Sequence, residues 1–334
     1  MVYPHNEDNM FNIGDYIQSI AARQFFSSID LYIDRERMNC PMNESAKLIM
    51  NGWFMHSPQN WPPSEKIYPL FVAFHMNKLA EKEMLSPEGV QYLKKYEPIG
   101  CRDHYTVSLL KSKGIDAYFS GCMTLTLGQT YQHEKVSNAK IYFTDLDYTL
   151  KHDFKFKLKC LYTLICRGVL LRKIRRRMNL CGVSKTMRTV AAFYVTFKNV
   201  ITDDLFTEAT YLAHEIPDTF ASNDEKFEYA EKLLKDYAKA KFVVSSRIHC
   251  ALPCLAMGTP IVLVTNELSG DVHNCRLDGL KQLFHTINID EEGIKSKIIG
   301  NSKLNMESTF TNKQDYKPLA EKLIVKCQSF VSED

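Results

Sequence analysis

The sequence predicts an α/β protein of two Rossmann-like domains, each built on a mostly parallel sheet. Its 334 residues exceed the length that one hydrophobic core usually supports. Short apolar segments of strand length alternate with segments of helical periodicity in both halves of the chain, which is typical of βαβ units. Hydrophobic residues make up 45% and charged residues 24%, so we expect a globular chain and not a disordered or fibrous one.

The first domain, residues 1–130, is predicted to begin with a helix at the corner formed by residues 12–15. Apolar residues recur at helical spacing directly after this corner, at Ile13, Ile17, Ile20 and Ala21. Two further helices are expected to begin at Ser86 and Asp103, each a residue type that caps helices, and the second is expected to end at Gly114. Strands are predicted over residues 47–50, 67–74, 99–101 and 115–119.

The second domain is predicted over residues 131–312, after a polar linker at residues 128–138. Its strands are expected at residues 139–144, 190–197, 242–245 and 261–264, and its helices at residues 224–239 and 247–257. The remaining residues, 313–334, are expected to contain a helix from 317 to 327 that crosses back to the first domain.

The ten cysteines are scattered, with no C-x-x-C pair and no spacing typical of a zinc site. They are interpreted as reduced thiols of a cytoplasmic protein, and no metal site is expected. The polar start of the chain does not resemble a secretion signal, and no apolar run has the length of a membrane span.

The most informative segment is the predicted strand end at Ser245 and Ser246, followed by Arg247 and His249. A serine that caps the next helix would place both Arg247 and His249 in its first turn, where unpaired backbone N–H groups attract anions. Arginine matches a phosphate or carboxylate, and histidine transfers protons near neutral pH. The alternatives are an arginine that only binds a carboxylate of the protein and a histidine with a structural role.

Two other corners have the same character. Asp103 is expected to cap a helix while Arg102 faces the space above the sheet, or else forms a surface ion pair. Gly14, beside Asn12 and Asp15, permits close approach of the backbone to a ligand. The chain lacks the motifs of dinucleotide folds, phosphate loops, zinc proteases and serine hydrolases, so these classes are disfavoured.

Together, the three corners resemble the polysaccharide pyruvyltransferase family over roughly residues 10–285. The motifs are Asn-x-Gly-Asp at residues 12–15, Arg-Asp-x-x-x-x-Ser at 102–108 and Ser-x-Arg-x-His at 245–249. The resemblance implies a GT-B-like arrangement with the active site in the cleft between the domains. It also implies phosphoenolpyruvate as the donor substrate, a sugar as the acceptor, and a pyruvate ketal and phosphate as products, with no cofactor.

The resemblance also assigns roles to residues of this chain. It implies that His249 and Arg247 are catalytic, and that the donor is bound by Arg102 and Arg247 with Ser246, Asn12, Gly14 and Asp15. The acceptor is expected near Trp53 and Asn51, where this chain departs from the family's glycine-rich stretch. A second departure is Gly121-Cys122, where the family often has Asp-Pro. The rival hypotheses are a GT-B-type glycosyltransferase that uses a nucleotide-sugar and a catalytically silent carbohydrate-binding protein.

A basic insert distinguishes the second domain. Residues 151–188 hold twelve Lys and Arg residues and one acid, Asp153, whereas the rest of the chain holds 30 basic and 38 acidic residues. Apolar residues interleave with the cations, which predicts a basic amphipathic helix on an anionic membrane surface. A peripheral location of this kind would suit a lipid-linked oligosaccharide acceptor. A solvated charged face is the alternative, and nucleic-acid binding is not expected because no recognition motif accompanies the charge.

Overall fold

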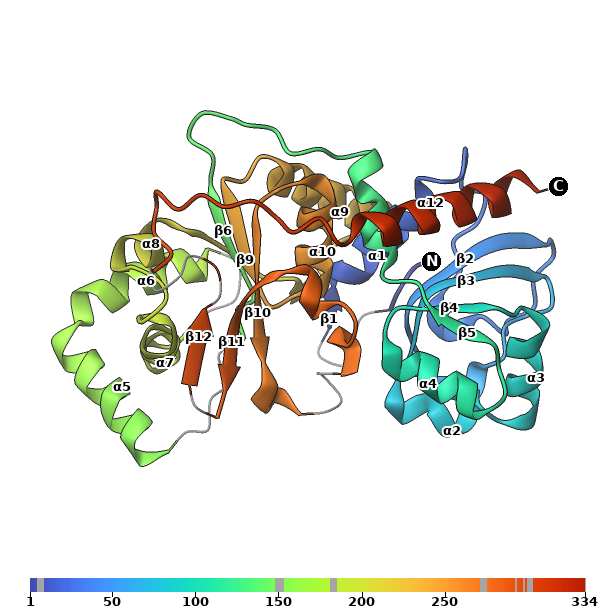
Figure 1. Cartoon of the computed structure of the whole chain (residues 1–334), viewed down its shortest axis with the longest axis horizontal. Coiled ribbons are helices and arrows are strands. Elements are labelled where there is room, and N and C mark those ends of the chain that lie inside the picture. The colour runs from blue at the N-terminus through green and yellow to red at the C-terminus, as the bar shows by residue number, and fades with distance from the viewer. Residues whose placement is uncertain are drawn as a thin grey trace.

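The computed structural model describes residues 1–4, 9–147, 153–180, 185–270, 275–291, 293–296, 298 and 303–333. It is a mixed α/β structure with two larger sheets, one formed by each half of the chain, and a two-stranded ribbon (Figure 1). The first of the larger sheets is wholly parallel, and the second is parallel except for one edge strand. The predicted α/β class with mostly parallel sheets is therefore confirmed.

The first sheet has four parallel strands in sequence order. They are β2 (Ala46–Phe54), β3 (Ile67–Met76), β4 (Ile99–Cys101) and β5 (Ala117–Phe119). One face packs on three helices, α2 (Glu81–Met84), α3 (Pro87–Lys95) and α4 (His104–Ser112). Met50 and Phe71 point to these helices, while Ile49 and Val72 point to the opposite face, as the period of two in a strand requires.

The second sheet has six strands in the order β12, β11, β10, β9, β6 and β7, with β12 antiparallel to its neighbour. Their bounds are β6 (Ile141–Thr144), β7 (Thr210–Leu212), β9 (Phe242–Ser245), β10 (Ile261–Asn266), β11 (His285–Asp290) and β12 (Gly293–Ser296). One face packs on α9 (Asn223–Ala238) and α10 (Ile248–Met257). The other face is covered by α5 (Phe154–Cys166), α6 (Gly168–Asn179), α7 (Met187–Phe197) and α8 (Asp203–Glu208).

Segments from the two ends of the chain connect the sheets. Strand β1 (Met10–Asn12) pairs with β8 (Glu215–Pro217), and α1 (Ile13–Arg23) then contacts β2 on one side and α9 and α10 on the other. Helix α12 (Lys317–Ser332) packs on the 3₁₀ helix η4 (Met123–Gln129) and on β3. Figure 1 shows α12 running across to the first sheet. One core cluster therefore includes residues of both halves.

Most predicted helices and strands are present, but the strand predicted over residues 190–197 is wrong. These residues belong to α7, whose N-terminus is capped by Thr186. The helix is buried on most of its surface, and a short apolar run fits a buried helix as well as a buried strand. Within the described part of the chain, no helix is both long and apolar enough to cross a membrane.

Candidate functional site

Three junctions between a strand and a helix build the site. At the first, the side chain of Asn12 accepts a hydrogen bond from the Gly14 backbone N–H at 3.0 Å and caps α1. At the second, Asp103 caps α4 by accepting from the Thr106 N–H at 2.8 Å. At the third, β9 ends at Ser245 and α10 begins three residues later. The cap at Asp103 and the start of a helix at the Asn12 corner had both been predicted from the sequence.

The structure brings Arg102 and His249 together from the two halves of the chain. Nη1 of Arg102 lies 3.4 Å from Nε2 of His249 and 3.4 Å from Oε1 of Gln18. Both side chains are buried, with 0% exposure for Arg102 and 4% for His249. Nε and Nη2 of Arg102 have no hydrogen-bond partner among the described residues. The guanidinium is therefore a buried cation in which two nitrogen atoms, Nε and Nη2, have no hydrogen-bond partner in the described part of the chain.

His249 is held in its neutral form. Burial, followed by the charge of Arg102, holds its pKa well below the ordinary value. Because arginine only donates hydrogen bonds, the contact between the two side chains makes Nε2 of His249 the acceptor, with the proton on Nδ1. The imidazole thus presents a lone pair toward an N–H group of a guanidinium that stays protonated.

Gly14 lets α1 pack closely against His249. A Cβ atom there would lie 3.1 Å from Cβ of His249 and 3.2 Å from its Nδ1. Gly52 plays a similar part for Gln18, because a Cβ atom would lie 3.0 Å from Oε1 of Gln18 and the residue has φ +110°. Both glycines therefore allow the groups around Arg102 to pack closely.

Arg247 is engaged by carboxylates of the protein. Its Nε donates to Asp145 Oδ2 at 2.9 Å and its Nη2 to Glu215 Oε2 at 3.2 Å. Burial alone would lower its pKa, but Asp145 and Glu215 outweigh that effect and raise it. The sequence left open whether Arg247 binds an anionic ligand or a carboxylate of the protein. In the structure it binds carboxylates of the protein.

Neither serine caps α10, contrary to the prediction. Ser245 Oγ accepts from the Arg247 N–H at 2.9 Å, and Ser246 Oγ accepts from the Asp147 N–H at 2.7 Å. Arg247 itself occupies the position before the first turn, with extended backbone angles and no side-chain cap. Of Arg247 and His249, only His249 therefore lies in that turn. Ser245 is still part of strand β9, which orients its side chain to the neighbouring strand and not to the helix.

Two of the other predicted site residues, Asp15 and Asn51, contact Gln18. Asp15 accepts from Gln18 Nε2 at 3.1 Å and lies 3.5 Å from Nη1 of Arg35. Asn51 is buried and donates to the Gln18 carbonyl at 3.1 Å. Trp53 stacks with the guanidinium of Arg35, whose centre lies 5.0 Å from the ring centroid. Asp15 and Asn51 thus help to position Gln18, which contacts Arg102.

Two site residues were missed. His75, at the end of β3, contacts Asp103 with 2.6 Å between Nδ1 and Oδ2, and burial lowers its pKa to about 4 even though Asp103 opposes the shift. Its place at a strand's carboxyl end was a usable signal. Arg276 has its pKa lowered to about 10 by burial and then by Arg102. It lies in the 3₁₀ helix Cys275–Leu277, outside any strand-to-helix corner that would single it out.

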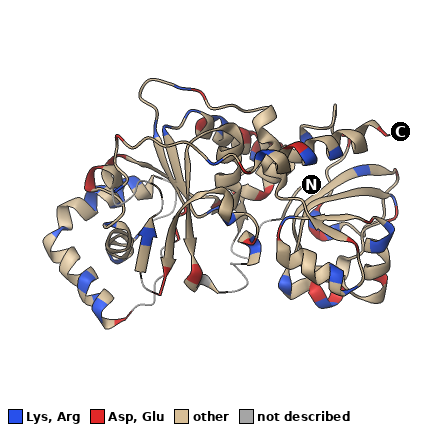
Figure 2. Cartoon of the chain, in the orientation of Figure 1, with Lys and Arg blue, Asp and Glu red and all other residues tan. Residues whose placement is uncertain are grey.

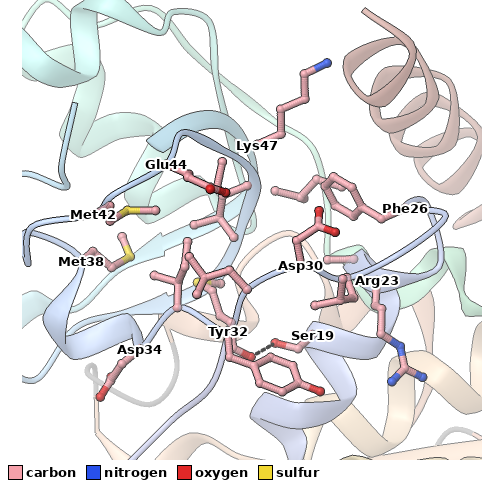
Figure 3. A pocket seen from close by; sticks show the side chains of 18 of the residues that line it. Ser19, Arg23, Phe26, Asp30, Tyr32, Asp34, Met38, Met42, Glu44 and Lys47 are labelled. Atoms are coloured by element: carbon pink, nitrogen blue, oxygen red, sulfur yellow. Dashed lines mark hydrogen bonds between the residues drawn. The ribbon is translucent and has the colours of Figure 1, made fainter. Parts of the chain in front are cut away.

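A cavity of about 900 Å³ lies away from these residues. Figure 3 shows Ser19, Arg23 and Phe26 on one of its walls and Lys47 near the start of β2. It adjoins the amino end of β2, whereas ligands of parallel sheets bind at carboxyl ends. We therefore take Arg102 and His249 as the candidate site and not this cavity.

A smaller cavity of about 250 Å³ lies beside Arg247. Its polar lining includes Asp145, Glu215 and Arg247, and its aromatic lining comes from Phe143, Phe193 and Tyr211. We call it the Arg247 cavity. Because Arg247 precedes His249 by two residues, the cavity adjoins the start of α10.

Comparison with known proteins gives one match. A family model described as "Polysaccharide pyruvyl transferase" matches residues 12–267, a range that contains all three strand-to-helix junctions. No curated protein and no solved structure matches the chain. Within the described ranges, no group of three or more His, Cys, Asp and Glu side chains is arranged to hold a metal ion.

Proposed function

The chain belongs to the polysaccharide pyruvyl transferase family, and on this premise we propose that it transfers a pyruvyl group from phosphoenolpyruvate to a sugar. The acceptor would be a precursor of a surface polysaccharide such as a capsule or exopolysaccharide, and the products a pyruvate ketal and phosphate. The observation that supports this proposal most directly is the buried guanidinium of Arg102, two of whose nitrogen atoms have no partner among the described residues, beside neutral His249.

The unpaired guanidinium favours an anionic substrate. Buried nitrogen atoms without hydrogen-bond partners are unfavourable, and the N–H groups on Nε and Nη2 of one guanidinium match a phosphate or carboxylate in bidentate geometry. Arg276 adds a second cation, close enough for the charge of Arg102 to lower its pKa. Phosphoenolpyruvate carries one phosphate and one carboxylate, so two cations suit it better than they suit a singly charged ligand.

The proposed reaction requires two proton transfers. The methylene carbon of phosphoenolpyruvate gains a proton and becomes a methyl group, while two sugar hydroxyls bond to the neighbouring carbon and each loses a proton. The C–O bond to phosphate breaks, and the second proton leaves with hydrogen phosphate. His249, protonated when the donor binds, would donate to the methylene and then accept a proton from one hydroxyl. The proton of the second hydroxyl goes to the departing phosphate, whose charge Arg102 and Arg276 stabilise.

Binding of the anion would itself activate His249. Burial and the positive charge of Arg102 hold the pKa of His249 down, and an anion on Arg102 would cancel the second contribution. The pKa of His249 would then rise as the complex forms, so that more of the protonated form is present when a substrate is bound than when the site is empty.

We place the acceptor sugar in the Arg247 cavity. Carboxylates of Asp145 and Glu215 can accept hydrogen bonds from sugar hydroxyls, and the aromatic rings offer apolar faces. In this arrangement Arg247 orients the two carboxylates and does not bind the phosphate. Trp53 is a weaker candidate for the acceptor because Arg35 already stacks on its ring. A lipid-linked oligosaccharide is the form of acceptor that we favour, with the protein cytoplasmic and in a GT-B-like arrangement.

The test is thermal stabilisation of the purified chain by phosphoenolpyruvate, compared with phosphate, pyruvate and a panel of nucleotide-sugars. We expect stabilisation by phosphoenolpyruvate that is lost in Arg102→Met and retained in Arg188→Met, a matched change at an exposed arginine. Stabilisation by a nucleotide-sugar alone would contradict the proposal and support a glycosyltransferase. Sugar binding with no phosphate release would indicate a carbohydrate-binding protein.

Calorimetry tests the proton uptake separately. Heats of phosphoenolpyruvate binding, measured in two buffers with different ionisation enthalpies, report the number of protons taken up. We expect uptake by the wild type and a smaller value for His249→Gln. Equal proton uptake by both proteins would rule out His249 as the group that titrates.

A further inference from the structure

Helix α5 has two apolar faces, and only one is buried. The inner face packs on α7 and comprises Phe156, Cys160, Thr163 and Leu164. The outer face exposes Phe154 (75%), Leu158 (49%), Leu161 (54%), Tyr162 (69%) and Ile165 (75%). These five residues are spaced i, i+4, i+7, i+8 and i+11, which places them on one side of the helix. We call them the outer stripe.

Basic side chains border the outer stripe on both edges. At 100° per residue, exposed Lys155 and Lys159 lie along one edge and exposed Lys157 lies along the other. Helix α6 adds exposed Arg172, Lys173 and Arg176, and Figure 2 shows Lys and Arg along both helices. The one acidic residue of the described range 153–180 is Asp153, which caps α5. The surface is therefore both apolar and strongly positive.

A continuous exposed stripe of this kind needs an explanation, because single exposed apolar residues are ordinary but contiguous patches mark interaction sites. Helices with an apolar face bordered by lysines lie in the interface of anionic bilayers, with the apolar side chains at the boundary between headgroups and acyl chains. A second copy of the chain would pair less well, because a twofold pairing of the stripe would bring lysine edges together.

We propose that α5 docks the protein on an anionic lipid surface, with the outer stripe inserted and Lys155, Lys157 and Lys159 against the headgroups. The inference goes beyond the proposed reaction and does not depend on it. Helix α5 follows β6 after nine residues, and Figure 1 shows its first turn on the same side of the molecule as the carboxyl ends of β10 and β11. Docking would therefore keep the strand ends that carry the site near the membrane.

Two variants of the full chain separate the apolar and electrostatic contributions. The stripe variant carries Leu158→Gln, Leu161→Gln and Ile165→Gln, and the lysine variant carries Gln at 155, 157 and 159. All six side chains are exposed, so both variants should melt like the wild type. Arg175 and Arg177 are unsuitable because they donate to the backbone carbonyls of Lys185 and Thr207.

Matched controls make the same changes elsewhere on the surface. The lysine control replaces three exposed lysines of the first half, Lys82, Lys94 and Lys113, with glutamine. The stripe control replaces three other exposed apolar residues, Tyr68 (55%), Leu79 (81%) and Val325 (63%), with glutamine. Each control matches its variant in the number of side chains removed, and the lysine control also matches it in residue type.

The measurement is co-sedimentation with vesicles of phosphatidylcholine, alone or mixed with phosphatidylglycerol, at two salt concentrations. We expect the wild type and both controls to bind the mixed vesicles, and less strongly at high salt. Each lysine near an anionic surface contributes about a fivefold factor, so the lysine variant should lose at least about tenfold in partition coefficient. The stripe variant should lose measurable binding.

Three results would overturn the proposal. The first is no binding of the wild type to the mixed vesicles. The second is a stripe variant that binds as well as its control. The third is sedimentation of the wild type as a dimer that the stripe variant abolishes, with no vesicle binding, because the stripe would then join two copies of the chain.

Discussion

Arg102 and Arg35 are both buried arginines, but their environments predict opposite effects of the same substitution. Arg102 has two nitrogen atoms without partners among the described residues. Arg35 is bound by Glu36 at 2.7 Å and by Asp15 at 3.5 Å. Burial alone would lower the pKa of Arg35, but these carboxylates raise it. We predict that Arg102→Met stabilises the unliganded protein and that Arg35→Met destabilises it.

The magnitudes follow from the hydrogen bonds. A buried unpaired polar group costs about 1–3 kcal/mol, whereas the two Arg102 contacts that would be lost are 3.4 Å long and therefore weak. Arg102→Met should therefore raise the free energy of unfolding by about 1–2 kcal/mol. Removing one partner from a buried ion pair costs about 3–5 kcal/mol, so Arg35→Met should lower the free energy of unfolding by that amount.

Urea denaturation at about pH 7.5 gives both free energies, and repetition with phosphoenolpyruvate gives the ligand-dependent part. Arg102→Met should be more stable than the wild type without ligand and gain nothing when ligand is added. If Arg102→Met instead loses several kcal/mol and still responds to phosphoenolpyruvate, Arg102 supports the fold and is not the anion-binding group.

Two further predictions concern the same region. The pKa of His75 is about 4 in the folded chain, so below pH about 6.5 the unfolded chain binds a proton that the folded chain does not. The free energy of unfolding should therefore fall as the pH falls from about 6.5 to 4. His75→Gln should remove about 1.4 kcal/mol of that loss per pH unit. If urea titrations at about pH 7 and 5 give the same change in the free energy of unfolding for the variant as for the wild type, the shifted pKa of His75 is contradicted. Gly14→Ala places a Cβ atom 3.1 Å from Cβ of His249, so turnover should fall about 10–100-fold while the melting temperature stays close to that of the wild type. Full turnover in this variant would show that the position of the His249 ring is not critical.

The residues that determine the site were predictable where the signal was local. Asn12 and Asp103 are helix caps that can be recognised from residue type and position. Arg102 follows a buried strand of the first sheet, and His249 follows one of the second. In a parallel sheet, such positions lie at the edge where ligands bind. Their direct contact across the two halves could not be predicted, because it depends on how α1 packs between the sheets.

Non-local contacts explain what sequence reasoning missed. Arg247 was placed correctly after β9, but its partner Glu215 comes from the ribbon strand β8, and nothing near Arg247 in the sequence indicates that pairing. Residues 190–197 were assigned the wrong element because burial on most sides removes helical periodicity. The sequence of residues 151–188 predicted a basic amphipathic helix. Only the exposed fractions of the side chains distinguish the outer stripe of α5 from its buried face.

The ribbon of β1 and β8 also has a consequence for synthesis of the protein. Met10 pairs with Pro217, so the strand that leads into α1 cannot find its partner until more than half of the chain has left the ribosome. Contacts of such long sequence separation form late and slowly. The first half of a nascent chain therefore carries Arg102 without His249, and the contact between these two side chains can form only in a chain whose translation is nearly finished.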